Sequence, residues 1–281
     1  MEANLPFRRP IMKITDLPRI TSKDNSRLKR ARAVRDGRER EMIFVEGVRL
    51  VTELIRSPLA PVELFVSDEF CERNGELIQK LASDFAPEIH EVELKIFNSI
   101  VDTENSQGIV VLAARPQQSD FNLQAIEKGL FIYLNKINNP SNLGAVVRSS
   151  EAVGVQGVLT SPESTDIFSP KAIRASMGSA FRLPLYSDIP LEEAVNLVKE
   201  QGMRVVAADI SAKKSYTEAI WSGPTMLVLG SEAHGLREAE LALVDETVLI
   251  PMENGVESLN LAVSAGIILF EAKRQQTEGG R

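Results

Sequence analysis

The segment IPMENGVESLNLAVSAGIILFEAKRQ, residues 250–275, is the stretch that decides the fold of this chain. A proline and a glycine frame a loop at its start, and Ser258 is a suitable N-cap for the run that follows. Residues 258–275 are apolar almost all round, so we expect a buried helix there. Asn260 is polar within this apolar run, and it therefore needs a hydrogen-bonding partner or a ligand.

Two further segments each place a polar turn after an apolar strand. In LVLGSEAHGL (227–236) the strand ends at Gly230, where glycine lets the backbone approach a ligand closely, and Glu232 follows. In NPSNLGAVVR (139–148) we expect Asn142 to cap a helix over 142–154. Arg148 lies six residues further on, and we expect it to project from a similar face. Taken singly, these segments fit an ordinary glycine-rich turn and an ordinary helix cap.

Strands and helices alternate through the second half of the chain. Predicted strands lie at 129–137, 157–160, 183–188, 204–210, 225–230 and 247–251, and predicted helices at 142–154, 190–201 and 258–275. This alternation predicts an α/β fold, a mainly parallel sheet with helices on both faces. Ligands of such sheets bind beyond the carboxyl ends of the strands. The three distinctive segments all fall at those ends.

The first half has a separate α/β pattern. A basic, helix-compatible run covers 26–40, strands are predicted at 42–47, 62–68 and 108–116, and helices at 48–57 and 72–83. Three prolines predict an extended lead-in over residues 1–25, and the polar stretch 116–124 reads as a linker. We therefore divide the chain into a lead-in (1–25), a small domain (26–116) and a larger domain (125–276).

In this order, at strand ends, the three segments resemble the motifs of the SpoU (TrmH-like) RNA ribose 2′-O-methyltransferases of the SPOUT superfamily, over residues 129–276. FVEGVRLVTELI (44–55) is similar, more weakly, to the L30e-like substrate-binding domain that precedes it in many members. The resemblance implies a mainly parallel sheet with a C-terminal deep trefoil knot, preceded by a small α/β domain that binds RNA. It also implies S-adenosylmethionine (SAM) as cofactor, a homodimer, and methyl transfer to ribose in RNA, with 23S-type rRNA favoured over tRNA.

The resemblance also implies roles for particular residues. The implied catalytic set is Arg148, Asn142, Glu232, Ser258 and Asn260, and the implied cofactor contacts are Gly230, Ile250, Met252, Ser258 and Leu259. A guanidinium does not readily lose its proton, so a general base is an awkward role for Arg148. We expect Arg148 to bind the RNA phosphate and to stabilise the developing alkoxide.

The net charge of −7 conceals a basic segment. Residues 8–40 hold twelve Lys/Arg and four Asp/Glu, a local net charge of +8, which leaves −15 for the rest of the chain. Such a segment suits a surface that faces phosphates. The RNA contacts expected there are Arg27, Lys29, Arg30, Arg32 and Arg35. A solvated or disordered basic tail explains the charge equally well.

Several other classes of protein are disfavoured. Cys71 is the single cysteine, and the two histidines are far apart with no ligand spacing, so we expect neither a disulfide nor a metal site. We expect no membrane span, and acidic residues among the N-terminal arginines favour a cytoplasmic location over an organellar one. The turn NNPSNLG has one glycine, which argues against a dinucleotide-binding enzyme. A non-catalytic RNA-binding or ribosome-assembly protein with the same fold stays open, although the intact motifs disfavour it.

Overall fold

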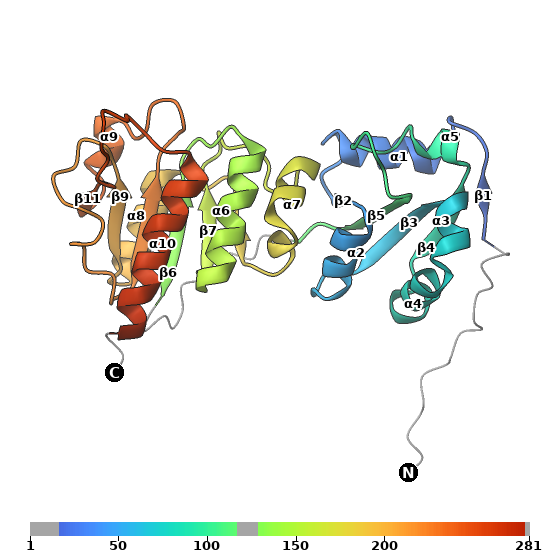
Figure 1. Cartoon of the computed structure of the whole chain (residues 1–281), viewed down its shortest axis with the longest axis horizontal. Helices are drawn as coiled ribbons and strands as arrows, with labels where there is room; N and C mark the ends of the chain where they lie inside the picture. Colours follow the sequence, from blue (N-terminus) through green and yellow to red (C-terminus); the bar gives the residue numbers. More distant parts are fainter. Residues whose placement is uncertain (1–16, 117–128, 279–281) are drawn as a thin grey trace, which may run out of the picture. The chain divides into compact units, whose positions relative to one another are not determined.

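The computed structural model describes residues 17–116 and 129–278 (Figure 1). The chain divides into two compact units, Met1–Pro116 and Gln117–Arg281, and each is described by itself. Residues 1–16 of the predicted lead-in, and all but Pro116 of the predicted linker, lie outside the described residues. Within the described ranges, no helix has the length and apolar character that crossing a membrane requires.

In residues 17–116, five strands form a mixed sheet with the order β1-β4-β3-β5-β2. β3 pairs in parallel with β4 and antiparallel with β5. The segment predicted as a lead-in supplies an edge strand, because β1 pairs with β4. The strands are β1 (Arg19–Ile20), β2 (Met42–Glu46), β3 (Pro61–Ser67), β4 (Glu88–Val92) and β5 (Ile109–Ala114).

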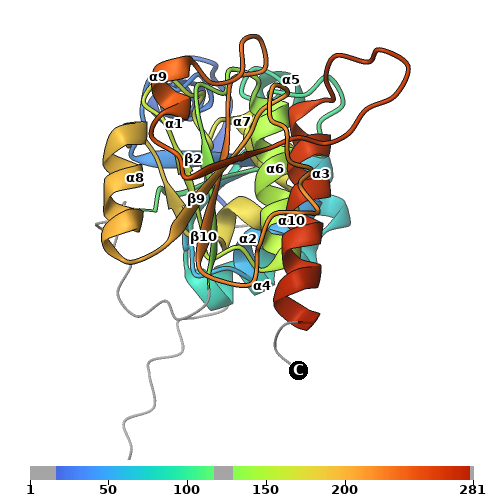
Figure 2. The same ribbon diagram turned by 90° about the vertical axis from the view of Figure 1, so that its left-hand side faces the viewer.

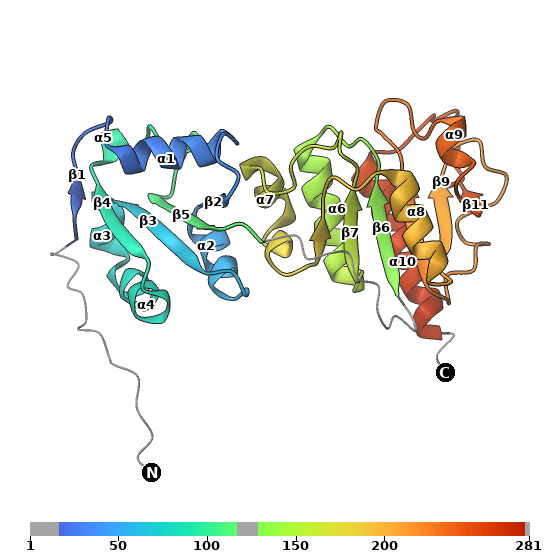
Figure 3. The same cartoon turned by 180° about the vertical axis from the view of Figure 1, so that it is seen from behind.

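Helices cover both faces of this sheet (Figures 1 and 3). α1 buries Leu28, Ala31 and Val34 in a core cluster that also contains Phe65 and residues of α5. α1 ends at Arg35 rather than at residue 40, because Gly37 turns the chain with a φ of 71°. The helices are α1 (Ser26–Arg35), α2 (Val48–Ile55), α3 (Asp68–Arg73), α4 (Gly75–Phe85) and α5 (Leu94–Phe97).

In residues 129–278, six strands form a sheet with the order β11-β9-β10-β6-β7-β8. Every neighbouring pair is parallel, which confirms the predicted parallel sheet. The strands are β6 (Leu130–Leu134), β7 (Gly157–Thr160), β8 (Leu185–Tyr186), β9 (Arg204–Ala208), β10 (Thr225–Leu229) and β11 (Glu246–Val248).

Helices α6 (Pro140–Val153) and α10 (Leu261–Glu278) lie side by side on one face of this sheet, and α8 (Leu191–Glu200) covers the other (Figure 2). Two short helices, α7 (Pro170–Ser176) and α9 (Glu238–Leu241), are absent from the sequence prediction. α7 packs closely on α6: a Cβ added to Gly144 would lie 2.3 Å from the carbonyl oxygen of Ala172. Glycine is therefore required where these two backbones meet.

The final helix differs from its prediction in start and in burial. α10 begins at Leu261, and its buried residues are Ala265, Ile268, Leu269 and Ala272. Val263 and Phe270 on the same helix are 51% and 56% exposed. The prediction that this helix is buried on all sides was therefore wrong for the single chain, because α10 lies in an outer layer with only one face against the core. The deep trefoil knot stays a prediction.

Candidate active site

The two central strands of the parallel sheet bring two of the distinctive segments together. β10 pairs with β6 in the register Leu229 with Leu134, so both strands end at the same level. Asn135 continues this alignment, since its backbone N–H donates to the carbonyl of Leu229 at 2.9 Å. The turn that leads into α6 and the loop that follows β10 therefore start beside each other.

The start of α6 corrects the prediction for Asn142. The N-cap is Asn139, whose side chain accepts from the backbone N–H of Ser141 at 2.9 Å, and Pro140 occupies the first turn. Proline suits that position because its missing N–H would have no helical partner there. Asn142 is thus inside the helix, and its side chain is available to contact another segment.

Glu232 lies at this helix start and accepts three hydrogen bonds. The donors are the backbone N–H groups of Asn138 at 3.3 Å and Asn139 at 3.4 Å, and Nδ2 of Asn142 at 3.2 Å. A carboxylate is favoured there because the N-terminus of a helix carries unpaired N–H donors and partial positive charge. Glu232 therefore fixes the loop after β10 against the first turn of α6.

Asn260 connects the third segment to the other two. Its Nδ2 donates to Oδ1 of Asn142 at 3.0 Å, and its Oδ1 accepts from the backbone N–H of Ala262 at 2.9 Å. Asn260 is therefore the residue that caps α10, and the prediction that Ser258 does so was wrong. The partner that the sequence required for Asn260 is Asn142. We call Glu232, Asn142 and Asn260 the amide relay.

The loop that carries Glu232 depends on Gly230. A Cβ at this position would lie 2.3 Å from the carbonyl carbon of Gly235. Ser231 and Gly235 close the loop with two backbone hydrogen bonds of 3.2 and 2.9 Å, and Gly235 has a φ of 63°. Glycine at 230 is therefore required by the fold of this loop, and the predicted approach of Gly230 to the cofactor stays a prediction.

The other predicted site residues are not joined to the amide relay. Arg148 is exposed on α6, and within the described residues its side chain makes neither an ion pair nor a hydrogen bond. Six residues turn a helix by about 600°, so Arg148 points about 120° away from Asn142, and the expectation of a similar face was wrong. Ile250 and Met252 are half-buried, while Ser258 and Leu259 are exposed on the segment before α10.

Two residues missed by the sequence analysis border the site. Lys136 lies two residues after the end of β6 and has a φ of 57°. Its Nζ lies 3.1 Å from Oε1 of Glu240. Burial alone would raise the pKa of Glu240, but hydrogen bonds from Arg237 and Lys136 outweigh it and lower the pKa to about 2. These two residues are 104 positions apart, and no local pattern connects them.

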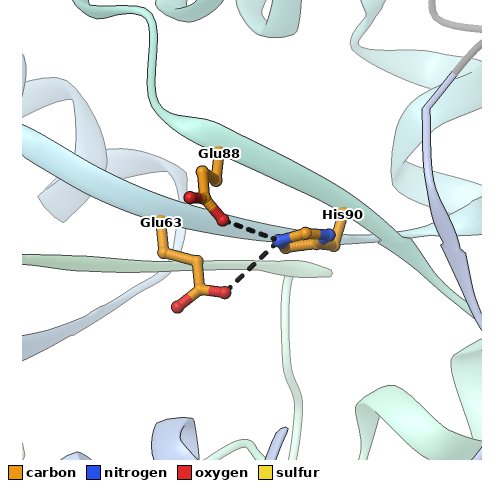
Figure 4. Close-up of side chains that lie close together, drawn as sticks. All are labelled: Glu63, Glu88 and His90. Carbon is orange, nitrogen blue, oxygen red and sulfur yellow. Dashed lines mark ion pairs between the residues drawn. The ribbon is translucent and has the colours of Figure 1, made fainter. Parts of the chain in front are cut away.

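The basic residues of α1 are engaged with the protein itself. Arg27 binds Glu63 at 2.8 Å and also contacts Glu88, and both carboxylates face His90 (Figure 4). The guanidinium neutralises the negative charge that this carboxylate pair would otherwise offer to a metal ion. Lys29 pairs with Asp24, Arg30 with Glu39 and Arg35 with Asp36, while Arg32 bonds Ser99 and the carbonyl of Lys23. Their contact with RNA stays a prediction.

Comparison with known proteins matches both units. The SpoU rRNA Methylase family matches residues 129–270, and the family described as RNA 2′-O ribose methyltransferase substrate binding matches residues 44–119. An uncharacterized tRNA/rRNA methyltransferase of Synechocystis is 30% identical over 93% of this chain and 96% of its own. The 23S rRNA (guanosine-2′-O-)-methyltransferase RlmB of Shewanella oneidensis is 30% identical over 85% of this chain and 99% of its own.

A solved structure is similar over most of the chain. The AdoMet-bound rRNA methyltransferase from Sinorhizobium meliloti superposes with a TM-score of 0.77, with 26% sequence identity over 92% of this chain and 98% of that one. The match spans both units, and the family match includes all three segments of the amide relay. With these similarities and the strand-end geometry, the predicted resemblance is confirmed, and this chain belongs to the SpoU rRNA methylase family.

Proposed function

We propose that this RNA methyltransferase transfers a methyl group from S-adenosylmethionine to a ribose 2′-hydroxyl of ribosomal RNA. The observation that carries the proposal is the amide relay, which joins the three motif segments at the carboxyl ends of the parallel strands. The Shewanella relative is named a 23S rRNA (guanosine-2′-O-)-methyltransferase, and this name supports both the ribose 2′-hydroxyl as acceptor and rRNA as substrate. The substrate-binding match over 44–119 supports the same acceptor.

The residues present fit the cofactor. Gly230 lets the loop after β10 fold back on Gly235 at the strand end, and Leu259, 37% exposed, offers an apolar surface for an adenine ring. Ile250 and Met252 extend this apolar surface along the same segment, with Ser258 as a polar neighbour. The cofactor supplies a methyl group activated by a sulfonium. The AdoMet-bound Sinorhizobium structure supports this assignment.

The protein has to position the ribose hydroxyl and stabilise the oxyanion that develops. Arg148 is suited to this because its guanidinium is exposed and, among the described residues, has no acidic partner. It binds the phosphate beside the target ribose and stabilises the alkoxide. The proton passes to a phosphate oxygen, a water molecule or a neighbouring side chain. The amide relay holds α6, and with it Arg148, against the cofactor segment.

The active protein is a homodimer in this proposal. Val263 and Phe270 are seven residues apart on α10 and therefore lie on one helix face, and both are more than half exposed. Large apolar side chains gathered on one face mark an interaction surface. The knot is part of the same proposal: Ser215 forms a bridge with Leu249, directly after β11 and twelve residues before α10 begins.

Mapping of ribose methylation tests the proposal. Total RNA from a strain that lacks the gene is incubated with the purified protein and methyl-labelled SAM, and the modified nucleotide is identified by mass spectrometry. We expect one 2′-O-methyl site in rRNA that is absent from the deletion strain and restored by the protein. RNA binding without any methyl transfer would favour a non-catalytic ribosome-assembly role. Methyl label in tRNA would show that the substrate is tRNA and not rRNA.

A further inference from the structure

A lysine–glutamate pair borders the candidate site without belonging to the predicted catalytic set. Nζ of Lys136 lies 3.1 Å from Oε1 of Glu240, and the Glu240 side chain is 10% exposed. Lys136 is also 3.4 Å from Glu163, but that carboxylate is 66% exposed. The interaction with Glu240 is therefore the better shielded of the two, and water screens it less.

Glu240 organises the loop that carries Glu232. Its Oε2 accepts from the backbone N–H of Arg237 at 2.8 Å, and its Oε1 accepts from the Arg237 guanidinium at 2.7 Å. Leu236 is buried in the core cluster, and Leu241 packs against that cluster. The carboxylate is thus held between two anchored residues, and it marks the far end of the loop 230–237.

Lys136 organises the turn that leads into α6. Its backbone N–H donates to Oγ of Ser161 at 2.8 Å, and the next N–H, of Ile137, donates to Oγ of Ser164 at 3.1 Å. Lys136 adopts a φ of 57°, a conformation that a side-chain-bearing residue holds only when its surroundings impose it. The pair with Glu240 is one of those surroundings.

The two loops consequently meet at two points. At one point Glu232 accepts the backbone N–H groups of Asn138 and Asn139. At the other, Glu240 binds Lys136. With a single contact the loops could pivot about Glu232, whereas two contacts fix their relative orientation.

We propose that Lys136 and Glu240 form a positioning pair that holds the loop of Glu232 against the turn before α6, and so sets the orientation of the amide relay. Neither residue is a catalytic residue. The inference rests on the proposed function for its kinetic readout, but its structural readout is independent of the substrate. No charge transfer or bond change is involved.

The test compares Lys136→Met, Glu240→Gln and the double variant with the wild-type protein. We expect each single variant to lower kcat about ten- to a hundredfold, because small displacements of a catalytic group have effects of that size. The melting temperature and the KM for RNA change little, and the double variant is no slower than the slower single one. Such non-additivity is the mark of two residues acting through one interaction.

Lys199→Gln is the matched control. Lys199 pairs with Asp245 at 2.7 Å, and Asp245 accepts from the N–H of Val205. Val205 is near the amino end of β9, so this pair lies at the opposite ends of the strands from the candidate site. We expect normal kcat in this variant. Unchanged kcat in Lys136→Met and Glu240→Gln would overturn the positioning role, and so would losses that multiply in the double variant or that follow the melting temperature.

Hydrogen exchange separates this inference from the proposed function. The amides of Lys136, Ile137, Asn138 and Asn139 should exchange at least about tenfold faster in Glu240→Gln, because the turn that carries them is no longer held through Lys136. If the wild-type protein methylates no RNA, the proposed function fails while this exchange result still decides the pair. Exchange at the wild-type rate would overturn the positioning role whatever the substrate.

Discussion

Asn142 donates a hydrogen bond from its Nδ2 to Oε1 of Glu232 at 3.2 Å, across 90 positions of sequence. An ionised carboxylate only accepts, so it determines which end of the amide faces it. Oδ1 of Asn142 is then left to accept from Asn260, whose own Oδ1 accepts from the N–H of Ala262. The direction of every hydrogen bond in the relay is therefore set at its two ends, by a carboxylate and by a helix cap.

Asn142→Asp should lower turnover more than Asn142→Ala. Aspartate removes the donor and places a second carboxylate against Glu232, which adds repulsion. Alanine removes the donor and the acceptor but adds no charge. We expect the alanine variant to lose about tenfold or more in kcat, since small displacements of positioned groups cost that much. The methyl-transfer assay measures both. Asn196→Ala, an exposed asparagine on α8, is the control, and equal turnover in all variants would contradict the relay.

Gly230→Ala should weaken SAM binding and destabilise the C-terminal unit. The added methyl group would lie 2.3 Å from the carbonyl carbon of Gly235, so the loop has to shift. Overpacking of this kind costs about 1–3 kcal/mol of unfolding free energy. Calorimetric titration with SAM and thermal unfolding give the two values. Gly223→Ala has open space around its Cβ and should leave both unchanged; a normal affinity in Gly230→Ala would contradict the assignment.

Arg148→Ala should abolish methyl transfer while it preserves the fold and the affinity for SAM. Arg148 is exposed and has no partner in the described residues, so its removal should change stability by no more than about 0.5 kcal/mol. Arg148→Lys should also be slow, because an ammonium cannot make the bidentate contact of a guanidinium with phosphate. Near-normal turnover of the lysine variant would exclude the bidentate contact, and lost SAM binding in Arg148→Ala would indicate a structural role.

Phe270→Asp should convert the proposed dimer to a monomer. Phe270 is 56% exposed in the single chain, and burying a phenylalanine contributes about 1.5–3 kcal/mol per copy. Light scattering after size-exclusion chromatography measures the mass. Asn196→Asp on α8, on the opposite face of the sheet, should leave the mass unchanged. A wild-type protein that is already monomeric would contradict the dimer.

Acid should loosen the anchoring of α1 through Glu63. Burial tends to raise the pKa of Glu63, but hydrogen bonds from His90 and Arg27 outweigh it, so the pKa is lowered in the folded protein. A lowered folded-state pKa gives stability that is present above the unfolded value of about 4.3 and is lost as the pH falls through the folded value. Exchange of β3 and β4 amides between pH 3 and 7 should show this loss in wild type and not in Glu63→Gln. Glu76→Gln on α4 is the control, and it should follow wild type.

Sequence patterns predicted those strands and helices that consist of continuous or periodic runs of apolar residues. The parallel strands at 130–134, 204–208 and 225–229 follow runs of apolar residues, and the structure places strands there. β4 was missed because its sequence, EIHEV, contains three polar or charged residues that bind partners in the fold. Within the fold, arginines of α1 pair with carboxylates of the same unit, and their expected contact with RNA stays a prediction.

The site was predicted by residue type more accurately than by local geometry. Asn142 and Ser258 were each chosen as caps because asparagine and serine favour that position, yet Asn139 and Asn260 cap the helices. Pro140 could have corrected the first choice, since proline prefers the first turn and therefore places the cap just before it. Lys136 and Glu240 could not have been found from sequence, because their contact depends on how two remote loops fold back.

The close approach at Gly144 has a consequence for motion. At Gly144 the backbones of α6 and α7 meet beside only the Cβ of Ala175, which has no rotamers, so no rotamer change there can absorb a displacement of one helix relative to the other. Packed helices of this kind shift together or slide by small amounts. A ligand that moves α7 would therefore carry Asn142 and Arg148 with it as one rigid body, and the two residues would keep their spacing throughout the catalytic cycle.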